Sequence, residues 1–238
     1  MESSNKYIIA FIVVMTVLAA VILAGMREAT MASSLRNEEI FNKRAILFAV
    51  NDYLGKGLNA SNLSDDQVLA LFKERMEQVV LTMDGEVVPG VLAEKIDLAV
   101  EKKKPESERH LPLFIFNGKK EKIYILSVRG SGLWDEIWGS IAVRSDLNTI
   151  AGATFDHKGE TPGLGAEIKD NPGFPGQFVG KQLFRDGEVA ILVRKGGSRD
   201  KTYEVDGISG ATITADGVTE MLQRGIGYYR PYLESLSN

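Results

Sequence analysis

Residues 203–218 read Tyr-Glu-Val-Asp-Gly-Ile-Ser-Gly-Ala-Thr-Ile-Thr-Ala-Asp-Gly-Val, and this stretch decides the fold. A short β-like segment, 202–205, leads into small residues. Residues at helical spacing follow, namely Val218, Met221, Leu222 and Gly225. The pattern predicts a strand, a tight turn and a helix. Backbone N–H groups at a helix start are unpaired and carry partial positive charge, so an anion would be stabilised there.

A capped helix start without a ligand explains the same residues. Thr212 or Thr214 would then be the N-cap, and Gly207 and Gly210 would be turn residues. Turns rich in Ser, Thr and Gly are common before helices. The residues alone therefore leave a capped turn and a phosphate site equally open.

Composition narrows the possible partners. The 238 residues include 28 Lys and Arg against 32 Asp and Glu, and the net charge of −4 argues against nucleic acid. The chain has no Cys, which excludes a disulfide within it and thiolate ligation of a metal cluster. His110 and His157 are too few and too far apart to indicate haem or zinc.

An apolar segment lies near the amino terminus. Residues 7–26 carry no charge and are flanked by Lys6 and Arg27. About 20 helical residues span roughly 30 Å, the thickness of a bilayer core. A cleaved signal peptide is the alternative, with residues 31–34 as a weak cleavage site. We expect a retained anchor.

Charges around this segment bear on its orientation. Lys6 precedes it, whereas Arg27, Arg36, Lys43 and Arg44 follow it. Counted alone, the positive-inside rule would place the large domain in the cytoplasm. That count is weak, because long domains can cross a membrane largely regardless of charge.

The fold class predicted is α+β: a single amino-terminal transmembrane helix, a two-helix segment, and a β-rich domain with a carboxy-terminal helix. The expected divisions are residues 1–26, 27–110 and 111–238. Two helices are expected first: one over 34–54, ended by Gly55 and Gly57, and one over 65–80, with a capping box at Ser64 and Gln67. A strand over 86–92, a charged loop over 95–110, and a hairpin of 111–116 and 122–128 should follow. The remaining expected elements are strands over 140–144 and 149–155, a loop over 171–180, a buried strand over 188–194, and a last helix ended by Pro231.

Two further stretches combine glycine with functional side chains. Residues 130–139 contain both tryptophans, Trp134 and Trp138, which suit either a packed corner or a flat aromatic ligand. Residues 157–165 contain a Pro162-Gly163 turn. By itself, Glu160 in this stretch would be a capping or solvated residue.

A family resemblance joins these stretches. Residues 206–212, Asp-Gly-Ile-Ser-Gly-Ala-Thr, match the flavinylation motif Asp-x-x-Ser/Thr-Gly-Ala-Thr. Gly-Leu-Trp at 132–134 and Glu-Thr-Pro-Gly-Leu-Gly at 160–165 match the same family. The chain resembles the covalent FMN-binding proteins typified by the C subunit of the sodium-translocating NADH:quinone reductase. The G subunit of the Rnf electron-transport complex is the next closest resemblance.

The resemblance implies an FMN held on Thr212 through a phosphoester bond. It also implies that the cofactor contacts residues of all three stretches, with no catalytic residue and no metal on this chain. These implied contacts are Asp206, Ser209, Gly210, Ala211, Leu133, Trp134, Glu160, Thr161, Gly163, Leu164 and Gly165. The chain would then be a one- or two-electron carrier within a larger enzyme.

The biological setting is also implied by the resemblance. Other subunits would carry NADH oxidation, the iron–sulfur centres and the ubiquinone site, and a flavin transferase would attach the FMN. The chain would cross the bacterial inner membrane once, with its flavin domain on the periplasmic side, in a complex that pumps sodium. The alternatives are an Rnf G subunit and a membrane-anchored, non-redox binding domain. Residues 42–47 and the chain length favour the sodium pump.

Overall fold

The computed structural model describes residues 2–237, with side chains from Asn5 onward. These residues divide into two compact units at Asn42 and Lys43, each described here by itself.

The described residues of the first unit all lie in helix α1 (Glu2–Phe48). This helix is long and apolar enough to cross a membrane, and its apolar side chains between Tyr7 and Met26 are exposed. The expectation of a separate helix over 34–54 is wrong, because one helix continues to Phe48. No Gly or Pro lies between residues 26 and 48 to interrupt it. A 3₁₀ turn, Asn51–Tyr53, then precedes Gly55.

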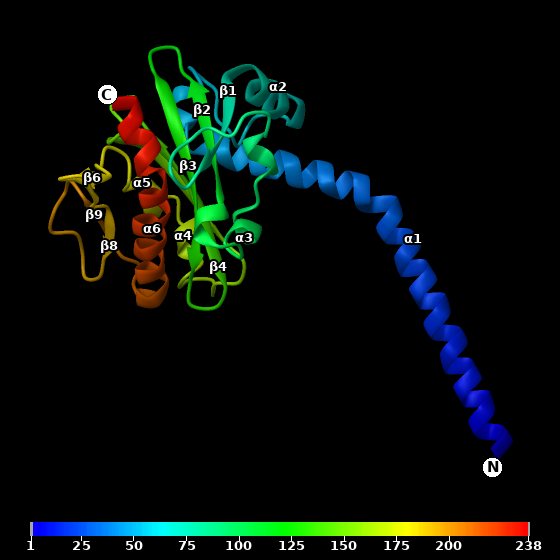
Figure 1. Ribbon diagram of the computed structural model, residues 1–238. Coiled ribbons are helices and arrows are strands. Elements are labelled where there is room, and N and C mark those ends of the chain that lie inside the picture. The colour runs from blue at the N-terminus through cyan, green and yellow to red at the C-terminus, as the bar shows by residue number, and fades with distance from the viewer. Residues whose placement is uncertain (1, 238) are drawn as a thin grey trace. The chain divides into compact units, whose positions relative to one another are not determined.

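The second unit is built on a five-stranded antiparallel sheet whose strands follow one another in chain order (Figure 1). The hairpin around Asn117-Gly118 is confirmed, since Asn117 pairs with Lys122. The two strands predicted over 140–144 and 149–155 are also confirmed, although the first begins four residues earlier. The strands are β1 (Met76–Thr82), β2 (His110–Asn117), β3 (Lys122–Ser131), β4 (Glu136–Val143) and β5 (Ile150–His157).

Both faces of the sheet are covered, which explains why six consecutive residues of β2, 111–116, are buried. One face packs against helix α6 (Thr212–Ser237) and the short helices α4 (Glu167–Asp170) and α5 (Gly173–Gly176). Helix α2 (Asp65–Arg75) lies against the other face, where the Phe72 and Phe114 rings meet edge to face. The predicted capping box of α2 is confirmed at Ser64 and Gln67.

Short elements complete the second unit, and α6 lies between β3 and some of them (Figure 1). They are α3 (Leu98–Glu101), β6 (Phe184–Arg185), β7 (Glu188–Val189), β8 (Leu192–Arg194), β9 (Glu204–Asp206) and the 3₁₀ turns Ala93–Lys95 and Glu106–Glu108. The charged loop predicted over 95–110 therefore contains helical turns.

Two predictions around β1 are wrong for reasons of long-range pairing. The helix predicted over 65–80 ends at Arg75, because Met76–Thr82 pair with β2 in seven register positions. The strand predicted over 86–92 is reduced to a single bridge between Val87 and Leu81. Pro89 cannot donate a ladder hydrogen bond, and Gly90 turns the chain with φ of +77°.

Two predictions in the carboxy-terminal part are also wrong. The strand expected over 188–194 breaks at Ala190 and Ile191, whose N–H groups both bond to the Leu183 carbonyl. Helix α6 does not end at Pro231 but continues to Ser237. Pro231 has no N–H group, so one helical hydrogen bond is missing. The helix stays continuous because side chains on both sides of Pro231, including Tyr229 and Leu233, are buried against the sheet.

Residues 43–238 form one compact unit, and the division expected at residue 110 falls inside β2. Strand β1 precedes this division in the chain and β3 follows it, yet both pair with β2 in one sheet. The division into residues 27–110 and 111–238 stays a prediction.

Tyr229 fixes α6 to the sheet. Its fully buried hydroxyl group donates towards the Pro112 carbonyl at 2.8 Å and the Ser127 carbonyl at 3.0 Å. Burial raises the pKa of Tyr229, so the phenol stays protonated. The two carbonyls belong to β2 and β3, so one side chain holds the helix across both strands.

Replacement of Tyr229 by Phe should lower the free energy of unfolding by about 1–3 kcal/mol, because it leaves buried carbonyls without their donor. Urea unfolding of the full chain in neutral detergent measures this. Tyr228→Phe, at a half-buried neighbour, is the control and should cost less than about 0.5 kcal/mol. Equal losses for the two variants would contradict the role given to the Tyr229 hydroxyl.

Candidate functional site

Three separate loops carry the residues singled out from the sequence. Residues 132–134 form the turn between β3 and β4. Residues 160–165 follow β5 and lead into α4. Residues 206–212 run from the end of β9 to the first residue of α6. Hydrogen bonds and close packing bring parts of all three loops together.

The Glu160 carboxylate links the loops. Only 4% of Glu160 is exposed. Its Oε1 accepts a hydrogen bond from the Trp134 backbone N–H at 2.9 Å, and its Oε2 accepts one from the Thr214 hydroxyl at 2.7 Å. A Cβ on Gly132 or Gly165 would collide with this carboxylate, so both positions need glycine. Glu160 therefore lies beneath the loops with both oxygens engaged.

Exposed apolar side chains surround this buried link. Trp134 is 69% exposed, and its indole N–H donates to the Thr161 hydroxyl at 3.1 Å. Leu133, Leu164 and Ile213 are also exposed. These four apolar side chains, from two of the three loops and from α6, are here called the apolar rim. Such a group of side chains suits contact with a flat apolar ligand.

The start of α6 offers unpaired backbone donors. Thr212 is its first residue, and the first helical N–H to bond back is that of Ala215, to the Ala211 carbonyl at 3.0 Å. The N–H groups of residues 212–214 thus have no partner within the helix, as at any helix start. Gly210 has φ of +75°, and a Cβ there would lie 2.8 Å from Leu164 Cδ2. The turn is therefore packed tightly against the apolar rim.

Three hydroxyl side chains at this turn, those of Ser209, Thr212 and Thr214, have different environments. Thr214 is 1% exposed and its hydroxyl is committed to Glu160. Ser209 is exposed, in the turn before the helix. Thr212 is half-buried at the first helical position. Of the two threonines, only Thr212 therefore combines accessibility with a place at the helix start.

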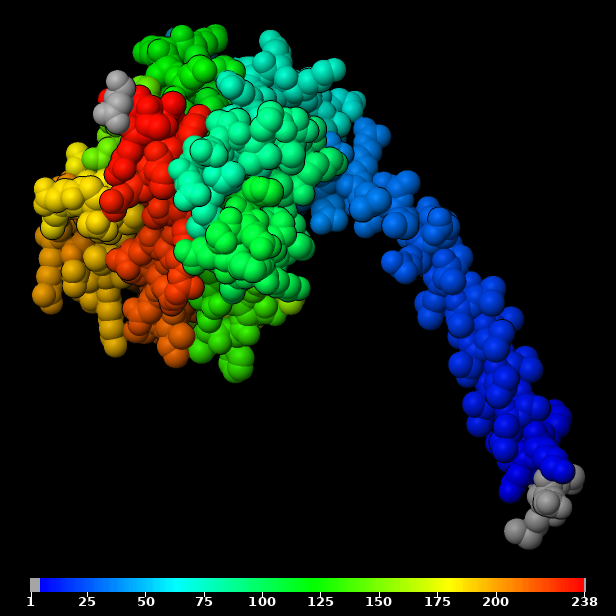
Figure 2. Space-filling model, viewed as in Figure 1, coloured from blue at the N-terminus to red at the C-terminus, as the bar shows by residue number. Residues whose placement is uncertain are grey.

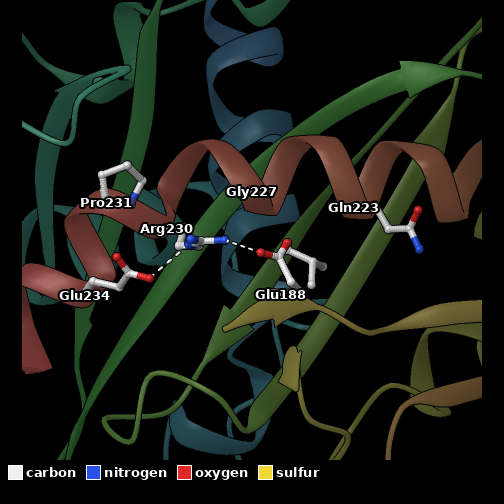
Figure 3. Close-up of a pocket in the computed structure, with 7 residues that line it drawn as sticks. Glu188, Gln223, Gly227, Arg230, Pro231 and Glu234 are labelled. Carbon is white, nitrogen blue, oxygen red and sulfur yellow. Dashed lines mark hydrogen bonds and ion pairs between the residues drawn. The ribbon is translucent and has the colours of Figure 1, made fainter. Parts of the chain in front are cut away.

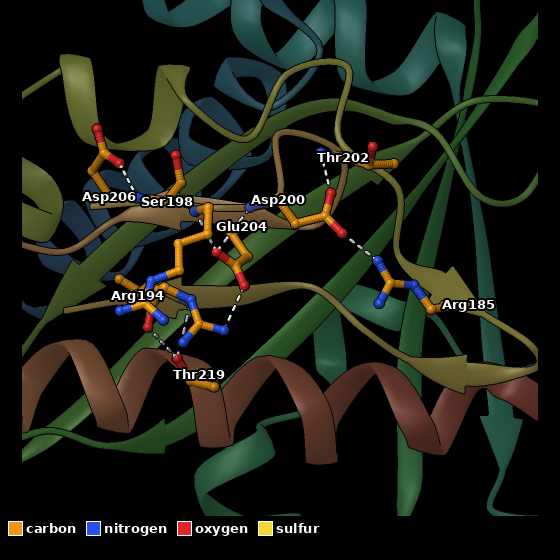
Figure 4. Close-up of polar contacts among 10 residues, drawn as sticks. Arg185, Arg194, Ser198, Asp200, Thr202, Glu204, Asp206 and Thr219 are labelled. Carbon is orange, nitrogen blue, oxygen red and sulfur yellow. Dashed lines mark hydrogen bonds and ion pairs between the residues drawn. The ribbon is translucent and has the colours of Figure 1, made fainter. Parts of the chain in front are cut away.

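Asp206 faces a different part of the molecule from Glu160. Its Oδ1 accepts a hydrogen bond from the Ser198 backbone N–H at 2.6 Å, which lowers the pKa of Asp206 (Figure 4). Its own backbone N–H donates to Gln177 Oε1 at 2.8 Å. Sequence reasoning missed Gln177, since no motif marks it. Asp206 thus shapes the turn from the side of the 196–198 loop.

An open depression adjoins the turn. Its volume is about 500 Å³, and Gly207, Ile208 and Ser209 form one wall. The opposite wall comes from α4, α5 and their surroundings: Gly163, Glu167, Asn171, Gly173, Phe174 and Gln177. Space for a ligand therefore lies directly beside the 207–209 turn. Among the described residues, no group of His, Asp and Glu could hold a metal ion.

Glu204 anchors the strand before the turn. Its carboxylate pairs with Arg194 and accepts hydrogen bonds from the N–H groups of Arg199, at 2.6 Å, and Asp200, at 3.1 Å (Figure 4). The hydrogen bond from Arg194, followed by that from Arg199, lowers the pKa of Glu204 to about 2. These contacts fix β9 beside β8, with which it pairs in parallel.

The fold and the site agree with a family model described as FMN-binding domain, which matches residues 132–227. All three loops fall within that range. The site residues fit such a cofactor, because unpaired helix-start donors lie beside an exposed apolar rim and a glycine turn. The chain thus contains an FMN-binding domain, matched over residues 132–227, and an apolar amino-terminal helix.

Individual relatives make the family more specific. The C subunit of a Na(+)-translocating NADH-quinone reductase from Pseudomonas aeruginosa is 31% identical, over 95% of this chain and 92% of its own length. The corresponding protein of Neisseria meningitidis serogroup A is 36% identical over 73% of this chain and 75% of its length. The crystal structure of the Parabacteroides distasonis C subunit superposes with a TM-score of 0.74 at 36% identity, over 85% of this chain and 96% of that one. The chain belongs to the family formed by the C subunits of the Na(+)-translocating NADH-quinone reductase.

Acid should weaken the fold through Glu204. Because its pKa in the folded chain lies near 2, below the usual 4.5, its stabilising contribution is complete above about pH 4.5 and is lost as pH falls towards 2. Glu204→Gln should therefore flatten the fall in unfolding midpoint over this interval, measured by thermal unfolding at several pH values. Arg194→Gln removes the main partner and should flatten the same interval. A midpoint that falls as steeply in both variants as in the parent chain would contradict this assignment.

Proposed function

We propose that this chain carries FMN bound covalently to the Thr212 side-chain oxygen through a phosphoester bond. The proposal rests on the different environments of Thr212 and Thr214. Thr212 lies half-buried at the helix start, whereas the Thr214 hydroxyl is buried and donates to Glu160. The phosphodiester of the attached FMN bears one negative charge, which the unpaired N–H groups at the start of α6 stabilise.

The proposed cofactor contacts come from all three loops. Leu133, Trp134 and Leu164 cover part of the flavin ring, and Thr161 holds Trp134 in place through the indole hydrogen bond. Ser209, Gly210 and Ala211 place the phosphate at the helix start, while Gly163 and Gly165 let the 160–165 loop approach closely. Glu160 acts from beneath, since both of its oxygens are engaged. Asp206 shapes the turn through Ser198.

The attached FMN supplies one- or two-electron redox chemistry. The chain's own residues hold, orient and shield it. The apolar rim excludes water from one side of the ring, and the backbone donors of α6 neutralise the phosphate. The chain therefore acts as an electron carrier within a complex, where other subunits supply NADH oxidation, the quinone site for ubiquinone and the sodium pathway. The names of the relatives, each a subunit of such a reductase, support this setting.

The chain is proposed to cross the bacterial inner membrane once, with α1 as the anchor and the flavin domain on the periplasmic side. The apolar helix and the membership of a membrane-complex family support the anchor. A dedicated flavin transferase would attach the FMN, because an unactivated hydroxyl does not displace AMP from FAD at neutral pH.

Orientation can be tested directly, because the chain has no Cys. Lys119→Cys introduces a thiol at the exposed turn of the β2–β3 hairpin. In intact cells, with the outer membrane made permeable, a maleimide that cannot cross the inner membrane should label this variant. Lys6→Cys, on the other side of the apolar segment, is the control and should be labelled only after lysis. The reverse pattern would place the large domain in the cytoplasm.

Thr212→Ala should abolish covalent flavin. Co-expressed with a flavin transferase, the parent chain should give a band that fluoresces after denaturing electrophoresis, and the Thr212→Ala band should be dark. Loss of one hydroxyl at a helix start costs at most about 0.5–2 kcal/mol, so the variant should stay folded.

Ser209→Ala and Thr214→Ala remove the neighbouring hydroxyls and can weaken the fluorescent band, since Ser209 lies beside the phosphate and Thr214 supports Glu160, but neither should abolish it. Peptide mass spectrometry of the parent chain should place the added mass on Thr212. Fluorescence that persists in Thr212→Ala would refute the attachment site. If the parent chain binds flavin but never retains it through denaturation, the chain is a reversible binding domain instead.

A further inference from the structure

A second cleft lies outside the candidate flavin site. It is enclosed by the segment of residues 98–111, strand β3 and helix α6, and its volume is about 270 Å³. Figure 2 shows the segment before residue 110, in green to cyan, beside α6 in red. The cleft contains none of the residues assigned to the flavin. It therefore needs an explanation of its own.

Apolar and cationic side chains line this cleft together. Leu98, Leu111, Val128 and Met221 supply apolar surface. Four cationic side chains line it against two carboxylates. The cations are Lys102, Arg109, Arg129 and Arg224, and the carboxylates are Glu101 and Glu220.

The carboxylates near the cleft are already engaged. Glu101 is 6% exposed, and its oxygens accept from Lys104 Nζ at 2.7 Å and the His110 N–H at 2.9 Å. Burial alone would raise the pKa of Glu101, but these two hydrogen bonds lower it below its usual value. Glu220 lies at the exposed mouth, paired with Arg224 in a solvent-exposed ion pair that contributes little.

The cations, by contrast, have donor capacity left over. Two of them share the Glu136 carboxylate, which forms an ion pair with Arg129 and whose Oε1 lies 4.0 Å from Lys102 Nζ. The buried Nε of Arg129 has no hydrogen-bond partner among the described residues. Arg109 is used differently, since it donates to the Lys102 and Lys104 carbonyls and so holds the loop. A group rich in acceptors is what this cleft lacks.

A depression on another face of α6 provides a contrast. There Arg230 lies between Glu188 and Glu234, each 2.9 Å away, so its charge is balanced within the protein (Figure 3). That depression has one cation against two carboxylates. In the cleft beside β3, by contrast, four cations share three carboxylates, Glu106, Glu136 and Glu220, so within the described part of the chain one positive charge has no carboxylate of its own.

We propose that the cleft between residues 98–111, β3 and α6 binds a small organic anion, a carboxylate or phosphate on a compact apolar body. Lys102, Arg129 and Arg224 would hold the anionic group, and Leu111, Val128 and Met221 would pack against the apolar body. A volume of about 270 Å³ suits a small ligand, since small-molecule sites begin at about 300 Å³. This inference does not depend on the flavin.

Phenyl phosphate is a suitable probe, since it joins one anionic group to one ring. Titration of the full chain in neutral detergent, followed by calorimetry and by saturation-transfer NMR, should show saturable binding. Inorganic phosphate and phenol, which each supply half of the probe, should bind at least about tenfold more weakly if both parts of the cleft are used. Binding of inorganic phosphate as tight as that of phenyl phosphate would overturn the proposal.

Reversal of two charges in the cleft tests whether the probe binds there. Lys102 and Arg224 are 47% and 62% exposed, so Lys102→Glu with Arg224→Glu should leave the fold intact, as thermal unfolding would verify. This double variant should weaken phenyl phosphate binding at least about tenfold through loss of charge-assisted hydrogen bonds. Arg230→Glu, on the same helix, is the matched control and should bind like the parent chain. Unchanged binding in the double variant, or no saturable binding in the parent chain, would refute the site.

Discussion

Helix α6 lies directly on strand β3 because three glycines remove the side chains that would separate them. A Cβ on Gly217 would collide with the Ser131 carbonyl, one on Gly130 would lie 2.7 Å from Met221 Cβ, and one on Gly225 would lie 2.7 Å from Val128 Cγ1. This close approach fixes the start of α6 relative to the turn that follows β3. The unpaired donors at the helix start and the exposed Trp134 therefore belong to one site. The same approach forms one wall of the cleft beside residues 98–111.

A buried charge then ties the loops to this frame. Burial of a carboxylate is costly unless hydrogen bonds replace its hydration. Glu160 receives them from two elements, the backbone of Trp134 and the hydroxyl of Thr214. Loss of either donor would leave a buried charged oxygen without a partner, so the arrangement of the loops is strongly specified. The family resemblance implied that Glu160 contacts the cofactor, whereas its geometry favours a supporting role.

Elements that depend on contacts within a few residues were predicted correctly from the sequence. The capping box of Ser64 and Gln67 and the Asn117-Gly118 hairpin each close within a few residues, and both are confirmed. Strand β1 was missed because Met76, Val79 and Val80 continue the helical spacing of α2, and pairing of Met76 with the distant Phe116 overrides it. In the site, the three family motifs were found in the sequence. The bond between Thr214 and Glu160, 54 residues apart, has no sequence signal.

The orientation of Asp206 bears on how an anion can be held six residues further along the chain. A carboxylate directed at the start of α6 would repel a phosphate and oppose the stabilisation that the helix N–H groups provide. Here the Ser198 N–H engages the Asp206 carboxylate, and the Gln177 side chain holds its backbone. The negative charge needed to shape the 206–210 turn is thus directed at the 196–198 loop. The same hydrogen bond lowers the pKa of Asp206 and so extends the ionised, hydrogen-bonded state of its carboxylate to more acidic pH, while the carboxylate stays directed away from the donors of α6.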